Sequence, residues 1–129
     1  MLLKRRLSVL WAAAIVLLTV LACSGIALAI TKTCSSSPCY GTNKDDTLNE
    51  RRGVNDEIIG LRGDDTIGRR VLPRAPDTDT LRGNGGSDRL KSGDYDGRDV
   101  LYGGKGRDVC TIDSNDSERG CEKLLVVVD

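Results

Sequence analysis

The hydrophobic residues of this chain form one long block near its start, a short block at residues 124–128 and recurring positions between the two. Residues 7–22 are almost wholly apolar. Beyond residue 40, single aliphatic residues recur at intervals of 9 to 14 positions, and each stands two positions after an aspartate. Glycine and charged residues fill most of the space between them. A short strand with one inward-facing side chain fits each of these positions. The pattern therefore predicts a series of short strands separated by turns.

The apolar block has the layout of a secretory signal peptide over residues 1–29. Basic residues precede the block, and residues 27–29 (Ala-Leu-Ala) supply a small–x–small cleavage pattern. Two alternatives remain open. Cys23 lies in a lipobox-like sequence and would then be lipidated, or residues 7–30 span a bilayer without cleavage. All three interpretations place the rest of the chain outside the cytoplasm, either secreted or attached to the cell envelope.

The rest of the chain is acidic and poor in aromatic residues. After residue 29, Lys and Arg fall from 19 to 16 while Asp and Glu stay at 19, which gives a net charge near −3. The aromatic residues that remain are Tyr40, Tyr95 and Tyr102, so a conventional core is not expected. The sequence contains no histidine, which excludes Ser–His–Asp and Cys–His catalysis and histidine-ligated zinc. We therefore expect no enzyme, no small-molecule substrate and no nucleic-acid partner.

Seven copies of one nine-residue unit, G-G-x-G-x-D-x-(apolar)-x, cover residues 41–111. Successive aspartates, at position six, are 10, 9, 14, 9, 11 and 9 residues apart. Each aspartate and the apolar residue at position eight form these pairs: Asp46 and Leu48, Asp56 and Ile58, Asp65 and Ile67, Asp79 and Leu81, Asp88 and Leu90, Asp99 and Leu101, Asp108 and Cys110. A repeat at a nearly fixed period indicates a unit of architecture rather than a set of surface loops.

This unit resembles the RTX, or hemolysin-type, calcium-binding repeat over residues 41–111. The resemblance implies an all-β fold in which the six glycine-rich residues of each unit form a turn and the last three form a short strand. Successive units then stack into a parallel β-roll solenoid of about seven repeats, with Ca²⁺ ions between neighbouring turns of the same side. We expect residues 30–40 to be a cysteine-containing lead-in and residues 112–129 to be a C-terminal cap.

The resemblance also assigns the calcium ligands to the aspartates at position six and to backbone carbonyls of the turns. Calcium prefers about six to eight oxygen ligands in loose geometry. Glycine allows the backbone to turn sharply enough for carbonyls to converge on one ion. The candidate ligands are the carboxylates of Asp46, Asp56, Asp65, Asp79, Asp88, Asp99 and Asp108 and the carbonyls of Gly60, Gly83, Gly85, Gly103 and Lys105.

The steps between aspartates distinguish the two edges of a roll that has two units per coil. Steps from an even to an odd copy are always nine residues, whereas steps from an odd to an even copy are 10, 14 and 11. All insertions therefore precede the turns of one edge, which also keeps fewer glycines. We name the two sets of turns by their aspartates: the odd edge has Asp46, Asp65, Asp88 and Asp108, and the even edge has Asp56, Asp79 and Asp99. The odd edge is expected to bind calcium, and the even edge to have lost part of this ability.

Four cysteines follow Cys23, and they predict two disulfides in an exported chain. Their count alone leaves three possible pairings. In a roll of about three and a half coils with strands ~4.8 Å apart, the two ends lie roughly 15 Å or more from each other. This separation is too large for a disulfide between the ends. We therefore expect the local pairs Cys34–Cys39 and Cys110–Cys121, with a buried free thiol at Cys110 as the alternative.

The sequence thus predicts an exported protein that binds Ca²⁺ through its repeats, with the ion serving structure rather than catalysis. The fold is expected to depend on calcium, because each strand buries one residue and the carboxylates crowd along two edges. The alternative is a surface interaction or adhesion module in which calcium is incidental. Calcium is the partner that the sequence indicates. A membrane would be reached only through an N-terminal anchor, and no protein partner follows from the sequence.

Overall fold

The computed structural model describes residues 28–68, 77–93 and 98–128, and every regular element in these ranges is a β-strand. Within the same ranges no helix has the length and apolar character needed to cross a membrane. The predicted signal peptide up to residue 27, including Cys23, lies outside the described residues. The strands are β1 (Thr31–Thr33), β2 (Cys39–Tyr40), β3 (Thr47–Asn49), β4 (Glu57–Arg62), β5 (Thr66–Gly68), β6 (Thr80–Gly85), β7 (Arg89–Lys91), β8 (Val100–Lys105), β9 (Val109–Ile112), β10 (Ser117–Arg119) and β11 (Lys123–Val126).

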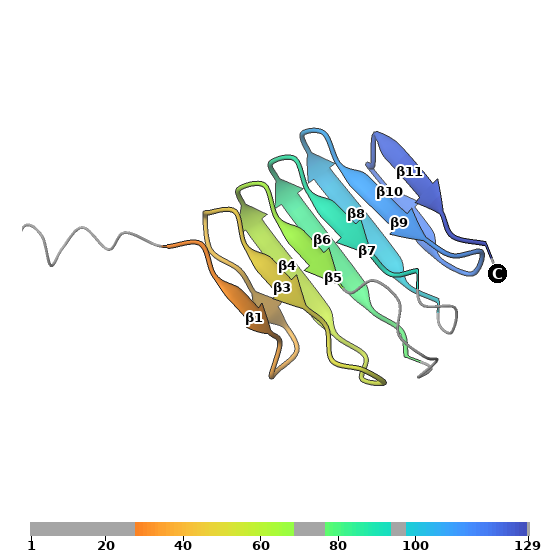
Figure 1. Ribbon diagram of the computed structural model, residues 1–129, viewed down its shortest axis with the longest axis horizontal. Helices are drawn as coiled ribbons and strands as arrows, with labels where there is room; N and C mark the ends of the chain where they lie inside the picture. Colours follow the sequence, from red (N-terminus) through yellow and green to blue (C-terminus); the bar gives the residue numbers. More distant parts are fainter. Residues whose placement is uncertain (1–27, 69–76, 94–97, 129) are drawn as a thin grey trace, which may run out of the picture.

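The strands form two parallel sheets, because the chain passes from one sheet to the other at every turn. One sheet has the order β1-β3-β5-β7-β9-β11, and the other has the order β10-β8-β6-β4-β2. Each strand pairs in parallel with the strand two places along the chain. Figure 1 shows the resulting stack of coils, with the first and last described strands at opposite ends. The predicted all-β roll with two units per coil is confirmed.

The pairing register places like positions of the repeat above one another. In the first sheet Leu48 pairs with Ile67 and Ile67 pairs with Leu90, and in the second sheet Ile58 pairs with Leu81. The side chains at position eight are all fully buried between the sheets: Leu48, Ile58, Ile67, Leu81, Leu90, Leu101 and Cys110. The core is therefore one side chain wide on each sheet, as the spacing of the aliphatic residues predicts.

The two sheets continue on both sides of the repeats. β1 pairs with β3, and β2 pairs with β4, at the N-terminal end. At the other end β10 pairs with β8, and β11 pairs with β9. These outer strands lack the nine-residue motif, yet they use the same backbone pairing as the repeats. The roll of parallel strands therefore extends from Thr31 to Val126.

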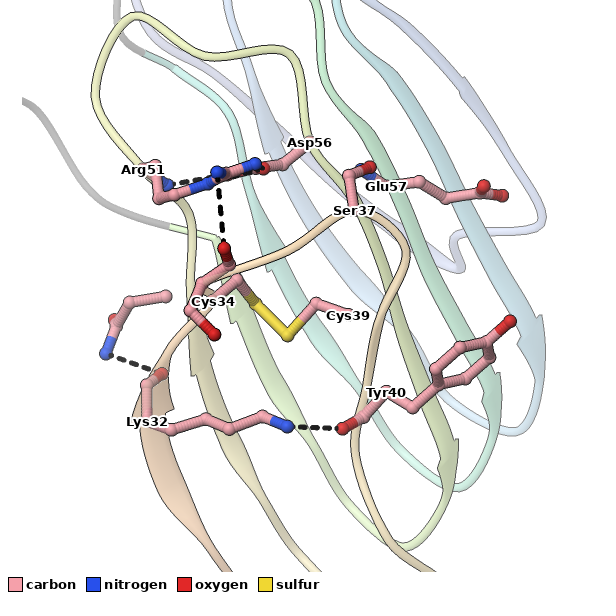
Figure 2. Close-up of a disulfide and its surroundings, with 10 residues drawn as sticks. Lys32, Cys34, Ser37, Cys39, Tyr40, Arg51, Asp56 and Glu57 are labelled. Carbon is pink, nitrogen blue, oxygen red and sulfur yellow. Dashed lines mark hydrogen bonds and ion pairs between the residues drawn. A yellow bond between two sulfur atoms is a disulfide. The ribbon is translucent and has the colours of Figure 1, made fainter.

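A disulfide is present at each end of the roll. Cys34 and Cys39, with Cα atoms 5.7 Å apart, close the first coil, and both cysteines are buried. Figure 2 shows this bridge beneath Arg51 and Asp56. Cys110 and Cys121, with Cα atoms 5.9 Å apart, close the last coil. The two pairs are the local ones expected from the sequence, and Cys110 carries its bridge from the inward position eight.

Candidate metal centres

Each repeat aspartate of the odd edge takes part in a ladder of hydrogen bonds that runs along the roll. The backbone N–H of one aspartate donates to Oδ1 of the aspartate in the next coil. The distance is 2.8 Å from Asp46 to Asp65, from Asp65 to Asp88 and from Asp88 to Asp108. The ladder fixes one oxygen of each carboxylate and aims the other at the turn.

The even edge has the same ladder with its own aspartates. The N–H of Asp56 donates to Oδ1 of Asp79 at 2.7 Å, and the N–H of Asp79 donates to Oδ1 of Asp99 at 2.7 Å. The N–H of Asp99 donates to Oδ1 of Asp116 at 2.9 Å. The position-six aspartates of both edges are therefore held by one local rule, in which each caps the N–H of its neighbour.

The second carboxylate oxygens of the odd edge are buried without a hydrogen-bond donor. Oδ2 of Asp65, Asp88 and Asp108 accepts no hydrogen bond from the described residues, and these side chains are fully buried. Burial of a charged oxygen without a donor or a counter-charge is costly. Three such atoms in successive coils therefore indicate that a cation from outside the chain compensates their charge.

The glycine at position one makes room for these oxygens. A Cβ atom built on Gly60 would lie 2.1 Å from Oδ2 of Asp65, and one built on Gly83 would lie 2.1 Å from Oδ2 of Asp88. At Gly103 the corresponding distance to Oδ2 of Asp108 is 2.6 Å. Only glycine can occupy these places without displacing the carboxylate.

Backbone carbonyls of the next coil reach the same places. The Cβ built on Gly60 would lie 3.0 Å from the carbonyl oxygen of Gly83, and the one built on Gly83 would lie 2.7 Å from that of Gly103. The one built on Gly103 would lie 2.1 Å from the carbonyl oxygen of Gly120. Each place thus has a carboxylate oxygen and a carbonyl oxygen close together, which is the donor set that Ca²⁺ prefers.

Two of the predicted carbonyl ligands lie in another part of the turn. The carbonyl of Gly85 accepts a hydrogen bond from the N–H of Gly63, and that of Lys105 accepts one from the N–H of Gly86, each at 3.0 Å. These bonds connect neighbouring turns. Gly63 and Gly86 have φ angles of 107° and 138°, which only glycine adopts without strain. The glycine at position four therefore shapes the turn.

The first turn of the odd edge differs from the other three. Thr42 stands where the repeat has its second glycine. Its backbone N–H donates to Oδ2 of Asp46, and its hydroxyl donates to Oδ1 at 3.1 Å. Oδ1 of Asp46 also accepts from the N–H of Ile30 at 2.7 Å. Both oxygens of Asp46 therefore have donors from the protein.

The first turn of the even edge contains a cation of its own. Arg51 stands at position one, where the odd edge has glycine. Its Nε and Nη2 donate to Oδ1 of Asp56 at 3.0 and 2.5 Å, and its backbone N–H donates to Oδ2 at 2.7 Å. Figure 2 shows the guanidinium lying along the carboxylate. The hydrogen bond to Asp56 raises the pKa of Arg51, so the group stays charged and neutralises this aspartate.

The second turn of the even edge brings three carboxylates together. One oxygen from each of Asp77, Asp79 and Asp99 lies within 4.8 Å of the other two, and all three side chains are buried. Asp77 was not among the residues predicted from the sequence, because it stands at position four. The other group of this kind among the described residues contains Cys110 and Cys121, which are joined in a disulfide.

The buried aspartates have raised pKa values. Burial raises the pKa of Asp65 to about 7 and that of Asp88 to about 6, against the partial opposition of the ladder hydrogen bond. Repulsion from neighbouring aspartates in the stack adds to the rise. Burial likewise raises the pKa of Asp79 to about 6, and it raises the pKa of Asp108 and Asp116. The carboxylates therefore resist ionisation unless a cation is near.

Several positions of the hydrogen-bond ladders do not follow from the sequence motif. Glu122 completes the odd ladder by accepting from the N–H of Asp108 at 2.7 Å, in a turn too short to match the nine-residue unit. Asp116 completes the even ladder. The repeat pattern does not mark it, because the residue two positions later is Glu118 rather than an aliphatic residue. A further row of hydrogen bonds joins the residues at position five of successive odd-edge turns. The N–H of Asp64 donates to Oδ1 of Asp45, and the N–H of Ser87 donates to Oδ1 of Asp64.

A protein-family model for the RTX calcium-binding nonapeptide repeat matches this chain in four copies, over residues 53–67 and 76–110. The match begins after the first copy that the period predicts. No curated protein and no solved structure matches the chain significantly.

Proposed function

We propose that this chain, which contains RTX calcium-binding nonapeptide repeats, binds Ca²⁺ between the turns of its roll and needs these ions to stay folded. The observation that carries the proposal is the row of fully buried Oδ2 atoms of Asp65, Asp88 and Asp108, which accept no hydrogen bond from the described residues. Each lies beside a carbonyl oxygen of the next coil. An ion with a preference for oxygen ligands completes this arrangement.

The chain's own residues have separate tasks in this function. The ladder N–H groups orient each carboxylate, the position-one glycines keep space for the ion, and the carbonyls of Gly83, Gly103 and Gly120 supply neutral oxygen ligands. When bound, Ca²⁺ supplies the positive charge that the buried carboxylates need. Its binding free energy then contributes directly to folding, because the unfolded chain does not hold these oxygens together.

The proposed setting of this function is outside the cytoplasm. Proteins with RTX repeats are generally secreted. Disulfides persist mainly in oxidising compartments, and the roll has one at each end. The signal peptide predicted over residues 1–29 agrees with this setting. We propose a structural rather than a catalytic role for the bound calcium, since the buried acidic groups belong to the repeated turns.

Far-UV circular dichroism of the purified protein tests the proposal. We expect a mostly disordered spectrum in EDTA and a β-rich spectrum in about millimolar calcium, the range in which extracellular calcium modules bind. Magnesium at the same concentration is the control, because its smaller octahedral shell fits this donor set poorly. Equal β-content in EDTA and in calcium would mean that calcium is incidental to the fold.

A further inference from the structure

The charges of the roll are sorted between its interior and its surface. Every buried charged side chain among the described residues is acidic, whereas the lysines and arginines of the same residues are all exposed or half-buried. Bound calcium would neutralise the acidic groups inside the roll and leave the basic groups outside it. The acidic net charge of the sequence therefore does not describe the surface that the folded chain presents.

One of the two sheets presents basic residues on an outer face without carboxylates. The outward side chains of β3, β5, β7, β9 and β11, which lie side by side in Figure 1, are aligned by the pairing register in two rows. One row contains Thr47, Thr66, Arg89, Val109 and Lys123, and the other contains Gly68, Lys91, Thr111 and Leu125. Neither row has an acidic residue. The other sheet differs, because Glu57 lies on its outer face and pairs with Arg82 at 3.2 Å.

Arg89, Lys91 and Lys123, which we call the basic strip, are available to an external anion. Arg89 and Lys123 are exposed and Lys91 is half-buried, and none of them forms an ion pair with a carboxylate of the described residues. Strand geometry places Arg89 and Lys91 about 6.6 Å apart along β7 and Lys123 about 10 Å from Arg89, two strands further on. Arg107, exposed and two residues before Val109, adds a positive charge beside the strip.

We propose that the basic strip binds a linear sulfated polysaccharide that lies along the axis of the roll. This inference goes beyond calcium binding but rests on the proposed calcium function, because the ions fold the roll and neutralise its interior. Sulfate groups stay ionised, and the fork of the Arg89 guanidinium can bind two oxygens of one such group. Thr66 and Thr111 pair with Arg89 and Lys91 in the same rows and offer hydroxyl donors.

The shape and chemistry of the face favour this polymer over other polyanions. β5 and β7 are each three residues long, about 10 Å, which accommodates one extended chain. A wider duplex or bilayer would also meet the odd-edge turns, where the carboxylates of Asp45 and Asp64 are exposed. The two rows contain no aromatic side chain on which the bases of a single nucleic-acid strand could stack. A carboxylated polymer offers the oxygen ligands that the turns use and would compete for calcium.

Titration of the full chain into fluorescently labelled dextran sulfate, in about millimolar calcium, tests the proposal, with uncharged dextran as the control polymer. The test variant combines Arg89→Gln and Lys91→Gln. The matched control combines Arg62→Gln and Lys44→Gln, which removes the same two residue types from exposed positions in odd-edge turns. We expect binding to weaken about tenfold in the test variant, through the loss of two surface ion contacts. The control should change it less than about threefold, because salt screens charges that are not in contact with the polymer.

The substituted side chains all lie at the surface, so both variants should keep the circular dichroism spectrum of the unmodified chain in calcium. Equal weakening in the two variants would overturn the proposal, because the polymer would then respond to net charge rather than to the strip. Duplex DNA, polygalacturonate or anionic lipid vesicles that bind as tightly as dextran sulfate would overturn the choice of polymer.

Removal of calcium separates this inference from the proposed function. In EDTA we expect the β-rich spectrum and the binding of dextran sulfate to be lost together. A chain that keeps both in EDTA contradicts the proposed function and supports the inference. A chain that folds in calcium but does not bind dextran sulfate overturns the inference alone.

Discussion

The two edges of the roll contain the same ladder of aspartates but satisfy it by different means. On the odd edge, three successive carboxylates keep a buried oxygen without a donor, beside a glycine that leaves space for an ion. On the even edge, Oδ2 of Asp79 is also buried without such a donor, whereas Arg51 stands in place of the glycine and binds Asp56 with its guanidinium. One coil further, Asp77 adds a third carboxylate to Asp79 and Asp99. Coils that share one backbone register therefore differ in the charge that each needs from outside.

This difference shows that the ladder and the metal site are separable features of the repeat. The ladder requires an acceptor at position six, and Glu122 and Asp116 serve it outside the repeat motif. An ion site requires in addition a free oxygen and space, which position one controls. Substitution at position one can thus remove the need for an ion at one turn and leave the stacking of the coils intact.

The largest effect is expected from closing the space on the odd edge. In Gly83→Ala the added methyl group would lie 2.1 Å from Oδ2 of Asp88 and 2.7 Å from the carbonyl oxygen of Gly103. We expect a loss of about 1–3 kcal/mol of stability in calcium from overpacking and a large rise in the calcium needed to fold. Calcium titrations followed by circular dichroism measure both.

Gly85→Ala is the control for Gly83→Ala in the same turn. A Cβ atom at Gly85 meets its nearest neighbour, the carbonyl oxygen of Leu61, at 3.7 Å, an ordinary contact. We expect a change within about 0.5 kcal/mol there. Equal losses in the two variants would show that position one has no special role in holding an ion.

A smaller effect is expected from removing the internal cation of the even edge. Arg51→Gly leaves the buried carboxylate of Asp56 without its guanidinium and restores the glycine of the repeat. We expect lower stability in EDTA, most of it recovered in calcium, and one additional ion bound per chain. Arg51→Lys keeps the charge but cannot form the two-nitrogen contact, so its stability in EDTA should lie between that of the unmodified chain and that of Arg51→Gly. A variant that gains no calcium dependence would contradict the view that Arg51 stands in for an ion.

Acid should partly replace calcium in folding the odd edge. The pKa of Asp65 rises from 3.8 to about 7 and that of Asp88 to about 6 on folding. A raised folded-state pKa stabilises the fold fully below the unfolded pKa, and this contribution is lost as pH rises through the folded value. Without calcium, β-content should therefore decrease from about pH 4 to pH 7. Saturating calcium should remove this dependence above about pH 5, because the ion favours the ionised carboxylates.

The smallest effect is expected from relieving backbone strain in an odd turn. Leu61 has a φ angle of 87°, a region that costs a leucine about 1–2 kcal/mol. A glycine at this position would remove this cost, but part of the gain in stability is lost because glycine is more flexible in the unfolded chain. Leu61→Gly should therefore stabilise the calcium-bound roll by about 0.5–1 kcal/mol. Asn84 occupies the same place with φ 75°, and Asn84→Gly should change stability less, because asparagine tolerates this region. Chemical denaturation in calcium compares the two.

The sequence was sufficient for the roll because its period directly reflects the backbone. Each aspartate marks the end of a turn, and the residue two positions later, such as Leu81 or Leu90, is forced inward by strand alternation. The disulfides followed from the same geometry, since a stack of coils keeps Cys34 far from Cys110. The coils at either end were harder to find. β1, β2, β10 and β11 pair with the sheets without the nine-residue motif, so no side-chain period marks them.

The chemistry of individual turns could be predicted less well. The low glycine content around Asp56 and Asp79 indicates weakened calcium sites. The motif does not show what a residue in place of a missing glycine does. Arg51 faces its own carboxylate only because position one lies beside position six of the same turn. Asp77 joins Asp79 and Asp99 through contacts across two coils. Such contacts depend on side-chain directions and not on spacing.

Anomalous diffraction from calcium-loaded crystals tests the central claim most directly, because it locates each ion against the carboxylates. We predict ions on the odd edge within about 2.3–2.6 Å of Oδ2 of Asp65, Asp88 and Asp108, with carbonyl oxygens of the next coil as further ligands. We predict no ion at Asp56, where Arg51 stays bound. An intact roll without ions beside the three odd-edge aspartates, or with Arg51 displaced by an ion, would contradict the account.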